Sequence, residues 1–371
     1  MKVFQRVVLV AGFVTLGVLF WKMDAGAVLT LVLQVGCGFI LILSQEIVAH
    51  LFNALGWRYA LRPQHVASFP FLKLLKFRIV GDAVNYLTPS ASTAGEVARA
   101  SLMGDSESFD DRLAGVVVAK CTQGLAQILF VLFGIAWLVG GMIPAIAPFQ
   151  GLLRVLATIS ALALAGLIVW EKRRKEPAAL RSSNGSPGGP KPASNGGAAP
   201  SGSFMASLRG VPKQLRLYLQ DHPGRNALSV VFFVLGYAWN AFEVYWICRF
   251  LDVPVSWGTA LAIEVLSNIV DGVLFMVPAK VGTQEAGKTA IFVLLGLPAR
   301  AGFAFGVVRH IRELSWGAFG LLLYSAHLKG RRRTVPAETP VAGAPGAAVC
   351  GSPALAETAA LGGDVKRAPA A

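Results

Sequence analysis

The sequence repeats one set of three residues at a fixed spacing, inside stretches that are otherwise strongly apolar. Each set is an aspartate, a proline seven residues later and a glutamate seven residues after that: Asp82, Pro89 and Glu96, then Asp271, Pro278 and Glu285. The second set follows the first by 189 residues at all three positions. In a membrane segment, acids and helix breakers survive only where they line a cavity or pair with other groups. The repeat therefore predicts two broken helical segments around a shared polar site.

The composition places the chain among membrane proteins. Hydrophobic residues make up 54% of the sequence, charged residues make up 15%, and the mean hydropathy is +0.59. Apolar runs recur at lengths close to the roughly 20 residues that a helix needs to cross a bilayer. We therefore expect an all-α polytopic membrane protein.

The apolar runs predict seven or eight spans. The first follows Lys2 and Arg6 and continues to Trp21, and we interpret it as an uncleaved helix rather than a signal peptide. The other long runs cover residues 28–52, 113–139, 152–170, 227–251, 257–277 and 301–327. A shorter run at 289–297 determines whether the count is seven or eight.

The chain divides into two pseudo-repeated membrane halves. We expect the first half at residues 1–170 and the second at 226–330, with Pro-interrupted or re-entrant helices at about 81–103 and 276–297. Between them, residues 171–225 are basic and then rich in Gly, Ser, Pro and Ala, which predicts a disordered linker. Residues 331–371 have a similar composition and predict a disordered tail.

Basic residues explain the net charge of +14 without nucleic acid as a partner. They gather at the edges of the apolar runs, at Lys73, Lys76 and Arg78, at Lys172, Arg173, Arg174 and Lys175, and at Arg331, Arg332 and Arg333. Such clusters mark cytoplasmic loops and contact anionic lipid headgroups. We expect the N-terminus, the loop at 58–78, the linker and the 331–333 cluster on the cytoplasmic side.

The four cysteines show neither metal nor redox spacing. Cys37, Cys121 and Cys248 lie in apolar runs and Cys350 lies in the tail. They are expected to be small buried hydrophobes. The sequence therefore predicts no metal site and no cofactor.

Polar residues inside the apolar runs recur on single helical faces. Three such stripes are Glu46, His50 and Asn53; Glu264, Asn268 and Asp271; and Lys120, Gln123 and Gln127. Arg309 and Glu313 are one turn apart and can pair. Because one charged residue at a helix centre costs roughly 2.5–3.5 kcal/mol on insertion, several stripes together favour a polar cavity. The alternative for each residue taken singly is snorkelling to the interface or a structural bond between helices.

The 189-residue offset also relates Lys120 to Arg309, each inside the apolar run after its broken segment. Duplicated halves that enclose a midplane site through interrupted helices are a common plan among transporters. The repeat therefore favours a structural duplication around a substrate path.

A formal phosphate-binding motif is present but lacks its context. Residues 282–289 have the sequence GTQEAGKT, which matches the P-loop pattern G-x-x-x-x-G-K-[ST]. A P-loop requires a preceding strand and a parallel sheet. Here the motif lies between two spans and contains Glu285 of the repeat, so we interpret it as a glycine turn that enters a helix.

Three segments carry a family resemblance: GDAVNYLTPSASTAGEVARA at 81–100, VPAKVGTQEAG at 277–287 and LGLP at 295–298. They resemble the flippase-like membrane family that includes the transmembrane region of lysylphosphatidylglycerol synthases. The resemblance covers about residues 7–328 and is greatest to the branch associated with hopanoid biosynthesis. It implies that Pro89, Gly95, Glu96 and Arg99 form one element, and Pro278, Gly282, Glu285 and Gly287 the other. We expect the chain to lack the aminoacyl-transfer domain of the synthases, and it places Lys280 where a small residue is expected.

The resemblance implies lipid movement across or within the inner membrane of a bacterium. We expect a non-enzymatic lipid transporter or flippase for a hopanoid, a phospholipid or an isoprenoid carrier. The residues expected to line its path are Asp82, Asn85, Pro89, Glu96, Arg99, Lys120, Asp271, Pro278, Glu285, Arg309 and Glu313. The acids are expected to share one chamber near the midplane, with the cations balancing their charge.

Two other functions remain open from the sequence. An intramembrane lipid-modifying enzyme could use the same acids as general acid and base. A non-transporting accessory could bind lipid-biosynthesis enzymes through the basic loops. The enzyme would change the mass of its lipid, whereas a transporter would change only the leaflet.

Overall fold

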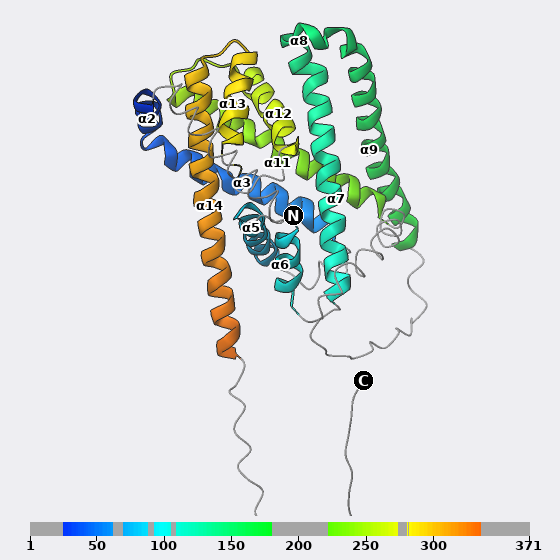
Figure 1. The fold of residues 1–371 in the computed structure, drawn as a ribbon. Coiled ribbons are helices and arrows are strands. Elements are labelled where there is room, and N and C mark those ends of the chain that lie inside the picture. The colour runs from blue at the N-terminus through cyan, green and yellow to red at the C-terminus, as the bar shows by residue number, and fades with distance from the viewer. Residues whose placement is uncertain are drawn as a thin grey trace, which may run out of the picture. The chain divides into compact units, whose positions relative to one another are not determined.

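A computed structural model describes residues 25–61, 70–87, 93–104, 109–179, 222–273, 280 and 282–334 (Figure 1). Pro89, Pro278, the first predicted span, most of the linker and the tail lie outside these residues. The regular elements of the described part are all helices. The all-α prediction is therefore confirmed.

The helices follow one another in two series. The first series is α2 (Ala25–Gln34), α3 (Gly38–Ala60), α5 (Phe71–Leu87), α6 (Ala94–Leu102) and α7 (Phe109–Gly134). It continues through a π-helical turn (Ile135–Val139), α8 (Gly140–Met142), a 3-10 turn (Pro144–Phe149) and α9 (Gln150–Ala179). The second series is α11 (Pro223–Phe250), α12 (Trp257–Val273), α13 (Thr283–Leu294) and α14 (Ala299–Thr334).

The two series share one helix order at nearly the same offset. A long helix, a helix carrying the aspartate, a short helix carrying the glutamate and another long helix follow one another in α3, α5, α6 and α7, and again in α11, α12, α13 and α14. The short helices begin at Ala94 and Thr283, 189 residues apart. This correspondence favours the duplication inferred from the sequence.

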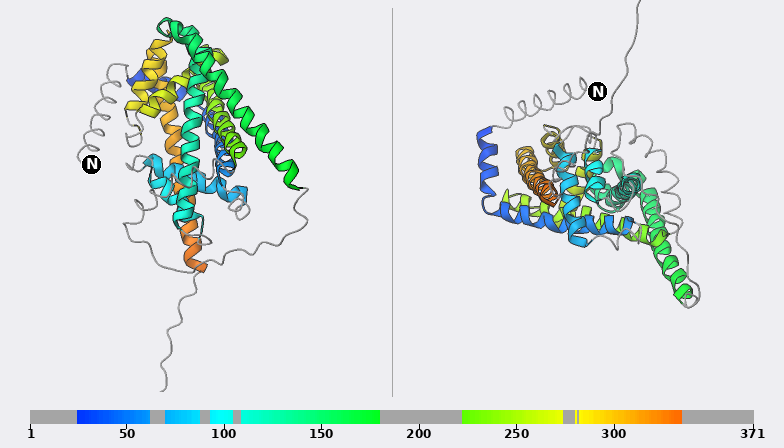
Figure 2. Two further views of the ribbon diagram at one scale, coloured as in Figure 1. Left: turned by 90° about the vertical axis from the view of Figure 1, so that its right-hand side faces the viewer. Right: turned by 90° about the horizontal axis from the view of Figure 1, so that it is seen from below.

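Helices of the two series pack together within one compact unit, residues 1–327. α3 and α11 lie side by side along much of their length (Figure 2). One apolar core lies among α2, α3, α11, α12, α13 and α14, and a second lies among α3, α5, α6, α7 and α11. α3 and α11 belong to both cores and so connect them.

Several predicted loop residues are helical instead. α5 begins at Phe71, so Arg78 is a buried helical residue and not part of a cytoplasmic loop at 58–78. α9 continues to Ala179, and α11 begins at Pro223. Both helices extend into the segment expected to be a linker.

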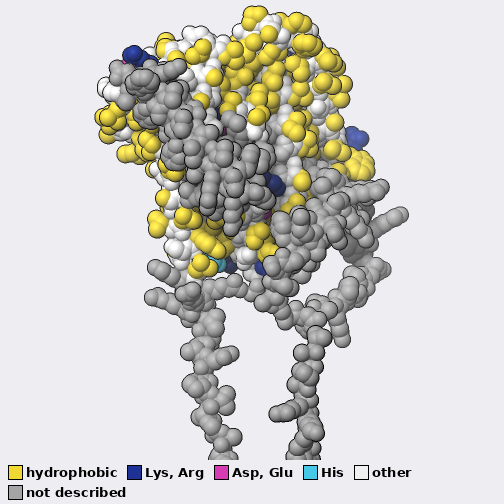
Figure 3. Space-filling model, in the orientation of Figure 1, with side chains coloured by type: hydrophobic (Ala, Val, Ile, Leu, Met, Phe, Trp, Pro, Cys, Tyr) yellow, Lys and Arg dark blue, Asp and Glu magenta, His cyan; other side chains and the backbone are white. Residues whose placement is uncertain are grey.

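Four helical segments of the described part are long and apolar enough to cross a membrane. They are Gly38–Ala60, Arg112–Met142, Pro144–Trp170 and Pro223–Phe250. Apolar side chains cover much of the face seen in Figure 3, and Leu152 and Leu162 of α9 are 61% and 68% exposed. Lipid is the solvent that suits such a surface. The chain is a multi-pass membrane protein.

The seam between α3 and α11 depends on close approach at Gly56. A Cβ atom added to Gly56 would lie 2.9 Å from the ring of Phe233, a side chain that is 0% exposed. The hydroxyl of Ser229 donates to the Gly56 carbonyl at 2.6 Å across the same seam. The absence of a side chain at residue 56 therefore permits both the ring packing and the hydrogen bond.

Gly56→Ala is expected to lower the free energy of unfolding by about 1–3 kcal/mol, because the buried ring has no space into which to move. Unfolding of the purified protein in detergent micelles measures the change. Gly124→Ala is the matched control, since a Cβ there meets nothing within 4 Å and Ala is the better helix former. Equal stability of the two variants would contradict the packing described.

Candidate functional site

A cavity of about 310 Å³ lies between the two series of helices. α3 and α5 contribute Glu46, His50, Asn53, Arg78, Asp82 and Tyr86 to its wall. α11 and α12 contribute Tyr237, Asn240, Glu264, Asn268 and Asp271. α14 contributes Arg309, Arg312, Glu313 and Trp316, and Lys280 lies between α12 and α13. The wall is thus strongly polar in a protein whose outer surface is apolar.

Helical periodicity explains how the polar stripes reach the cavity. Glu46, His50 and Asn53 are spaced by four and three residues on α3, which places them on one face. The same spacing holds for Glu264, Asn268 and Asp271 on α12. Both complete stripes line the cavity. From the third stripe on α7, Gln127 alone lines it.

Asp82 is the centre of the first half's wall. Arg78, one turn earlier on α5, contacts its carboxylate at 2.8 Å, and Arg99 of α6 contacts it at 2.5 Å. Nδ1 of His50 lies 3.9 Å from the same carboxylate. Two guanidinium groups on one carboxylate give this region a local excess of positive charge.

Glu96 lies behind this wall. Its carboxylate contacts Arg99 at 2.7 Å and Lys120 at 3.5 Å, and it accepts a hydrogen bond from the side chain of Asn85 at 3.2 Å. Asn85 also accepts a hydrogen bond from the backbone N–H of Gly95 at 2.7 Å. These bonds connect α5 to the start of α6 across the break. Glu96 therefore supports the wall without lining the cavity.

Asp271 is the corresponding centre in the second half. Lys288 of α13 contacts its carboxylate at 3.3 Å and Lys280 does so at 3.7 Å. Lys280 also lies 3.8 Å from the carboxylate of Glu313. Its φ of 53° is uncommon for a residue other than glycine, and the two carboxylates hold its side chain over the cavity.

Arg99 and Lys288 occupy equivalent positions in the repeat. Each follows its glutamate by three residues, and each binds the aspartate 17 residues earlier, before the break. Their side chains are 3% and 0% exposed. A buried cation on the short helix thus joins it to the preceding helix in both halves.

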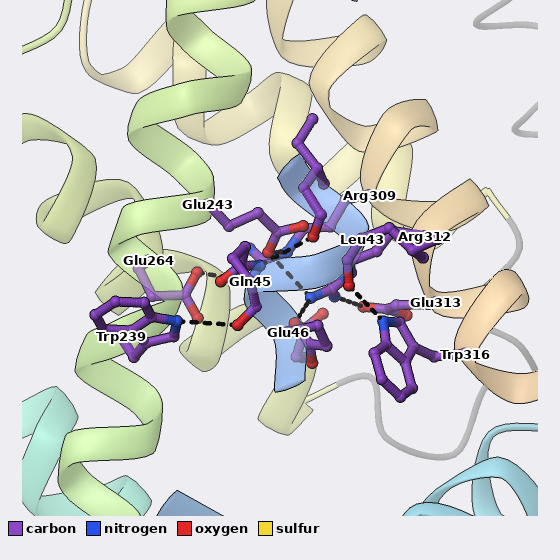
Figure 4. A network of polar contacts seen from close by, with 12 residues as sticks. Leu43, Gln45, Glu46, Trp239, Glu243, Glu264, Arg309, Arg312, Glu313 and Trp316 are labelled. Carbon is purple, nitrogen blue, oxygen red and sulfur yellow. Dashed lines mark hydrogen bonds and ion pairs between the residues drawn. The ribbon is translucent and has the colours of Figure 1, made fainter. Parts of the chain in front are cut away.

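A network of ion pairs joins residues of the cavity wall to one another and to Glu243 of α11 (Figure 4). Arg309 contacts Glu264 at 2.8 Å and Glu243 at 3.3 Å. Arg312 contacts Glu243 at 3.1 Å and is also paired with Glu46 of α3. The network therefore connects α3, α11, α12 and α14.

The expected pair between Arg309 and Glu313 does not form. Glu313 instead contacts Arg312 at 3.3 Å and Lys280 at 3.8 Å. Arg309 instead pairs with Glu243 of α11 and Glu264 of α12. These two carboxylates take the place of Glu313, which lies one turn away on the same helix as Arg309.

Glu285 also lies outside the cavity wall. Its carboxylate contacts Nδ1 of His310 at 2.6 Å. The cavity therefore brings together the aspartates of the two repeats, whereas the glutamates occupy positions behind the wall.

Among the expected path residues, those that line the cavity are Asp82, Asp271, Arg309 and Glu313. Those that do not are Asn85, Glu96, Arg99, Lys120 and Glu285; Pro89 and Pro278 lie outside the described residues.

Some residues of the wall, and Glu243 behind it, were not predicted. Glu243 is 0% exposed and pairs with both arginines of α14, yet it is an isolated acid in the α11 sequence. Arg312 belongs to the same helical face as Arg309, three residues away, and this spacing could have identified it. Tyr237 and Asn240 show the same three-residue spacing on α11.

The residues of the formal P-loop motif have structural roles. α13 begins at Thr283 after Gly282, whose φ is 71°, and the helix that precedes the motif is α12. Lys288 binds Asp271, and Thr289 donates to the Glu285 carbonyl at 2.7 Å. Within the described ranges, no group of three or more His, Cys, Asp or Glu side chains is placed to hold a metal.

The pairing of Asp271 with Lys288 can be tested by a double-substitution cycle. Asp271→Asn should lower the free energy of unfolding by about 3–5 kcal/mol, because it leaves a fully buried ammonium without its carboxylate. Combining it with Lys288→Met should recover much of that loss, since the uncompensated charge is gone. Unfolding in detergent measures both variants.

Asp252→Asn serves as the control because Asp252 lies in an exposed turn. It is expected to leave stability unchanged. Additive effects of the Asp271 and Lys288 substitutions would show that the two side chains do not interact.

Comparison with known proteins identifies the family. A sequence model described as the lysylphosphatidylglycerol synthase TM region matches residues 4–320. No curated protein and no solved structure gives a match. The matched residues include both series of helices as far as residue 320 of α14, and every residue of the cavity wall. The chain belongs to the family of the lysylphosphatidylglycerol synthase transmembrane region.

Proposed function

We propose that this protein moves a lipid between the leaflets of a membrane by passing its polar headgroup through the cavity while the acyl chains stay in the bilayer. The supporting observation is the cavity itself, which has a polar wall built from both repeats in a protein with apolar outer helices. Membership of a family named for a lipid synthase agrees with a lipid substrate. Transport is the part of this proposal that goes beyond the family.

The wall can replace part of the water that a headgroup loses. Moving a polar group into an apolar medium without hydrogen bonds costs roughly 2–7 kcal/mol. The buried wall atoms without a hydrogen-bond partner among the described residues include Nε2 of His50, Oδ1 of Asn240, Nη1 of Arg309 and Nε of Arg312. Both donors and acceptors are represented, so the wall can bind the different groups of a headgroup.

The ion pairs stabilise the cavity wall and also allow its arginines to exchange one partner for another. Arg309 and Arg312 each contact more than one carboxylate. A phosphate or hydroxyl that binds one of these arginines would therefore leave it with another partner. A cavity of this kind can accept a charged group without first leaving a charge unpaired.

We propose further that the protein is not an enzyme and has no cofactor. The substrate is a membrane lipid, with a hopanoid, a phospholipid and an isoprenoid carrier as candidates. We also propose that the protein lies in the inner membrane of a bacterium with its N-terminus in the cytoplasm. Lipid-biosynthesis enzymes are candidate partners, and anionic headgroups are expected at the basic helix ends.

Replacing two wall amides should slow lipid movement. The double variant Asn53→Leu, Asn240→Leu is expected to reduce the rate about tenfold or more, because each lost hydrogen-bonding group costs about 1–3 kcal/mol. The assay uses vesicles of phosphatidylethanolamine and phosphatidylglycerol with a nitrobenzoxadiazole-labelled phospholipid. Dithionite then measures how much label has reached the outer leaflet.

Asn226→Leu is the matched control. Asn53 and Asn226 each donate to the carbonyl four residues earlier, at 2.9 and 3.1 Å, but Asn226 does not line the cavity. The control should retain transport. An unchanged rate in the double variant would contradict the assigned path, and no transport by the wild type would contradict the function. A change in lipid mass would instead support an enzyme.

A further inference from the structure

A second, apolar pocket lies beside the helices that form the polar cavity. It has a volume of about 190 Å³ and is lined by Val32 of α2, Val35 and Gly36 of the turn after α2, Phe39 of α3, and Val308 and Ile311 of α14. An apolar cavity of roughly 150 Å³ accommodates benzene, so this pocket has room for a segment of hydrocarbon. Leu33, which also lines it, is 68% exposed, so the pocket opens towards the outer surface.

The pocket and the cavity lie along one seam between α3 and α14. On α14, Val308 and Ile311 line the pocket, whereas Arg309 and Arg312, one residue further in each case, line the cavity. Adjacent residues on a helix differ by about 100° in direction, so one turn of α14 faces both spaces. On α3, Phe39 and Glu46 are separated by about 10 Å of helix rise.

An ion pair of the cavity wall joins the same two helices. Arg312 of α14 contacts Glu46 of α3, and Nε1 of Trp316 donates to the carbonyl of Leu43 at 3.1 Å. Along α3 and α14, the side chains therefore change from apolar to charged within a few residues. A membrane lipid has the same order of chemistry, with acyl chain, polar linkage and headgroup following one another.

We propose that the apolar pocket binds an acyl chain of the lipid whose headgroup enters the polar cavity, so that lipid reaches the site through the seam between α3 and α14. This inference rests on the proposed function and adds the position of the tail. Its basis is that neighbouring residues of the same two helices line an exposed apolar pocket and a polar cavity. The glycerol region of the lipid then lies beside Arg312 and Glu46.

Photochemical labelling tests the pocket without requiring transport. The full-length protein is placed in phosphatidylethanolamine vesicles that contain phosphatidylglycerol with a diazirine in one acyl chain, and the labelled residues are mapped by mass spectrometry. Pocket residues such as Phe39 and Ile311 should be labelled. Excess unlabelled phosphatidylglycerol should suppress this labelling more strongly than labelling of exposed Leu162 on α9, which reports bulk lipid.

Two substitutions on α14 make the test specific. Ile311→Trp fills the pocket, and Leu314→Trp adds the same bulk nearby; the original side chains are 41% and 42% exposed. Ile311→Trp should abolish the competed labelling and slow transport about tenfold. Leu314→Trp should retain both.

The outcomes separate the pocket from the function. Competed labelling of the pocket in a protein that moves no lipid would support the binding site and contradict the proposed transport. Transport without pocket labelling, or equal effects of the two tryptophan variants, would overturn the proposed site. Protection of the pocket by residues 1–24 of the chain would give the same absence of labelling and would overturn it as well.

Discussion

The pairing of buried charges is the constraint on which this structure depends. A charge inside a bilayer is costly, and a buried carboxylate that loses its cation destabilises a protein by several kcal/mol. The described helices meet this constraint mainly through distant partners, such as Arg312 and Glu46, which are 266 positions apart. Because such pairs join α3, α11, α12 and α14, the interactions that neutralise the acids also determine which helices surround the cavity. The same ion pairs therefore stabilise the helix packing and neutralise the charges of the cavity wall.

The duplication provides a simple way to build such a site. Each half places an aspartate near the end of one helix and a cation on the short helix that follows the break, and the two side chains bind each other. The helices before and after the break thus remain connected by an ion pair. Two copies packed through α3 and α11 bring Asp82 and Asp271 to the same cavity. A single copy would supply only one side of the wall.

The sequence predicted what depends on local spacing. Periodicity predicted the helical class and the complete polar stripes on α3 and α12, and the fixed offset predicted the repeat of Asp82 with Asp271. Each of these is found in the structure. The ion-pair partners of the charged residues depend on tertiary packing and could not be predicted from the sequence. Glu243 is a single acid in its helix, and its role follows only from the arrival of Arg309 and Arg312 from α14. Likewise, Glu96 and Glu285 belong to the repeat, but the rotation of the short helices places their side chains behind the wall.

The two halves differ in how firmly the short helix is held. The guanidinium of Arg99 contacts both Asp82 and Glu96, and its planar fork suits two carboxylates at once. Lys288 has a compact charge and contacts Asp271, while Glu285 pairs with His310 of α14. At the first break, Arg99 thus bridges both acids, whereas at the second break Asp271 and Glu285 have separate partners. Separate pairs can be exchanged one at a time, at a smaller cost for each step than the loss of a bridge that holds both acids. Under the proposed transport, we therefore expect a headgroup to replace an existing partner most easily at the second break, where Lys280 lies between two carboxylates at the cavity.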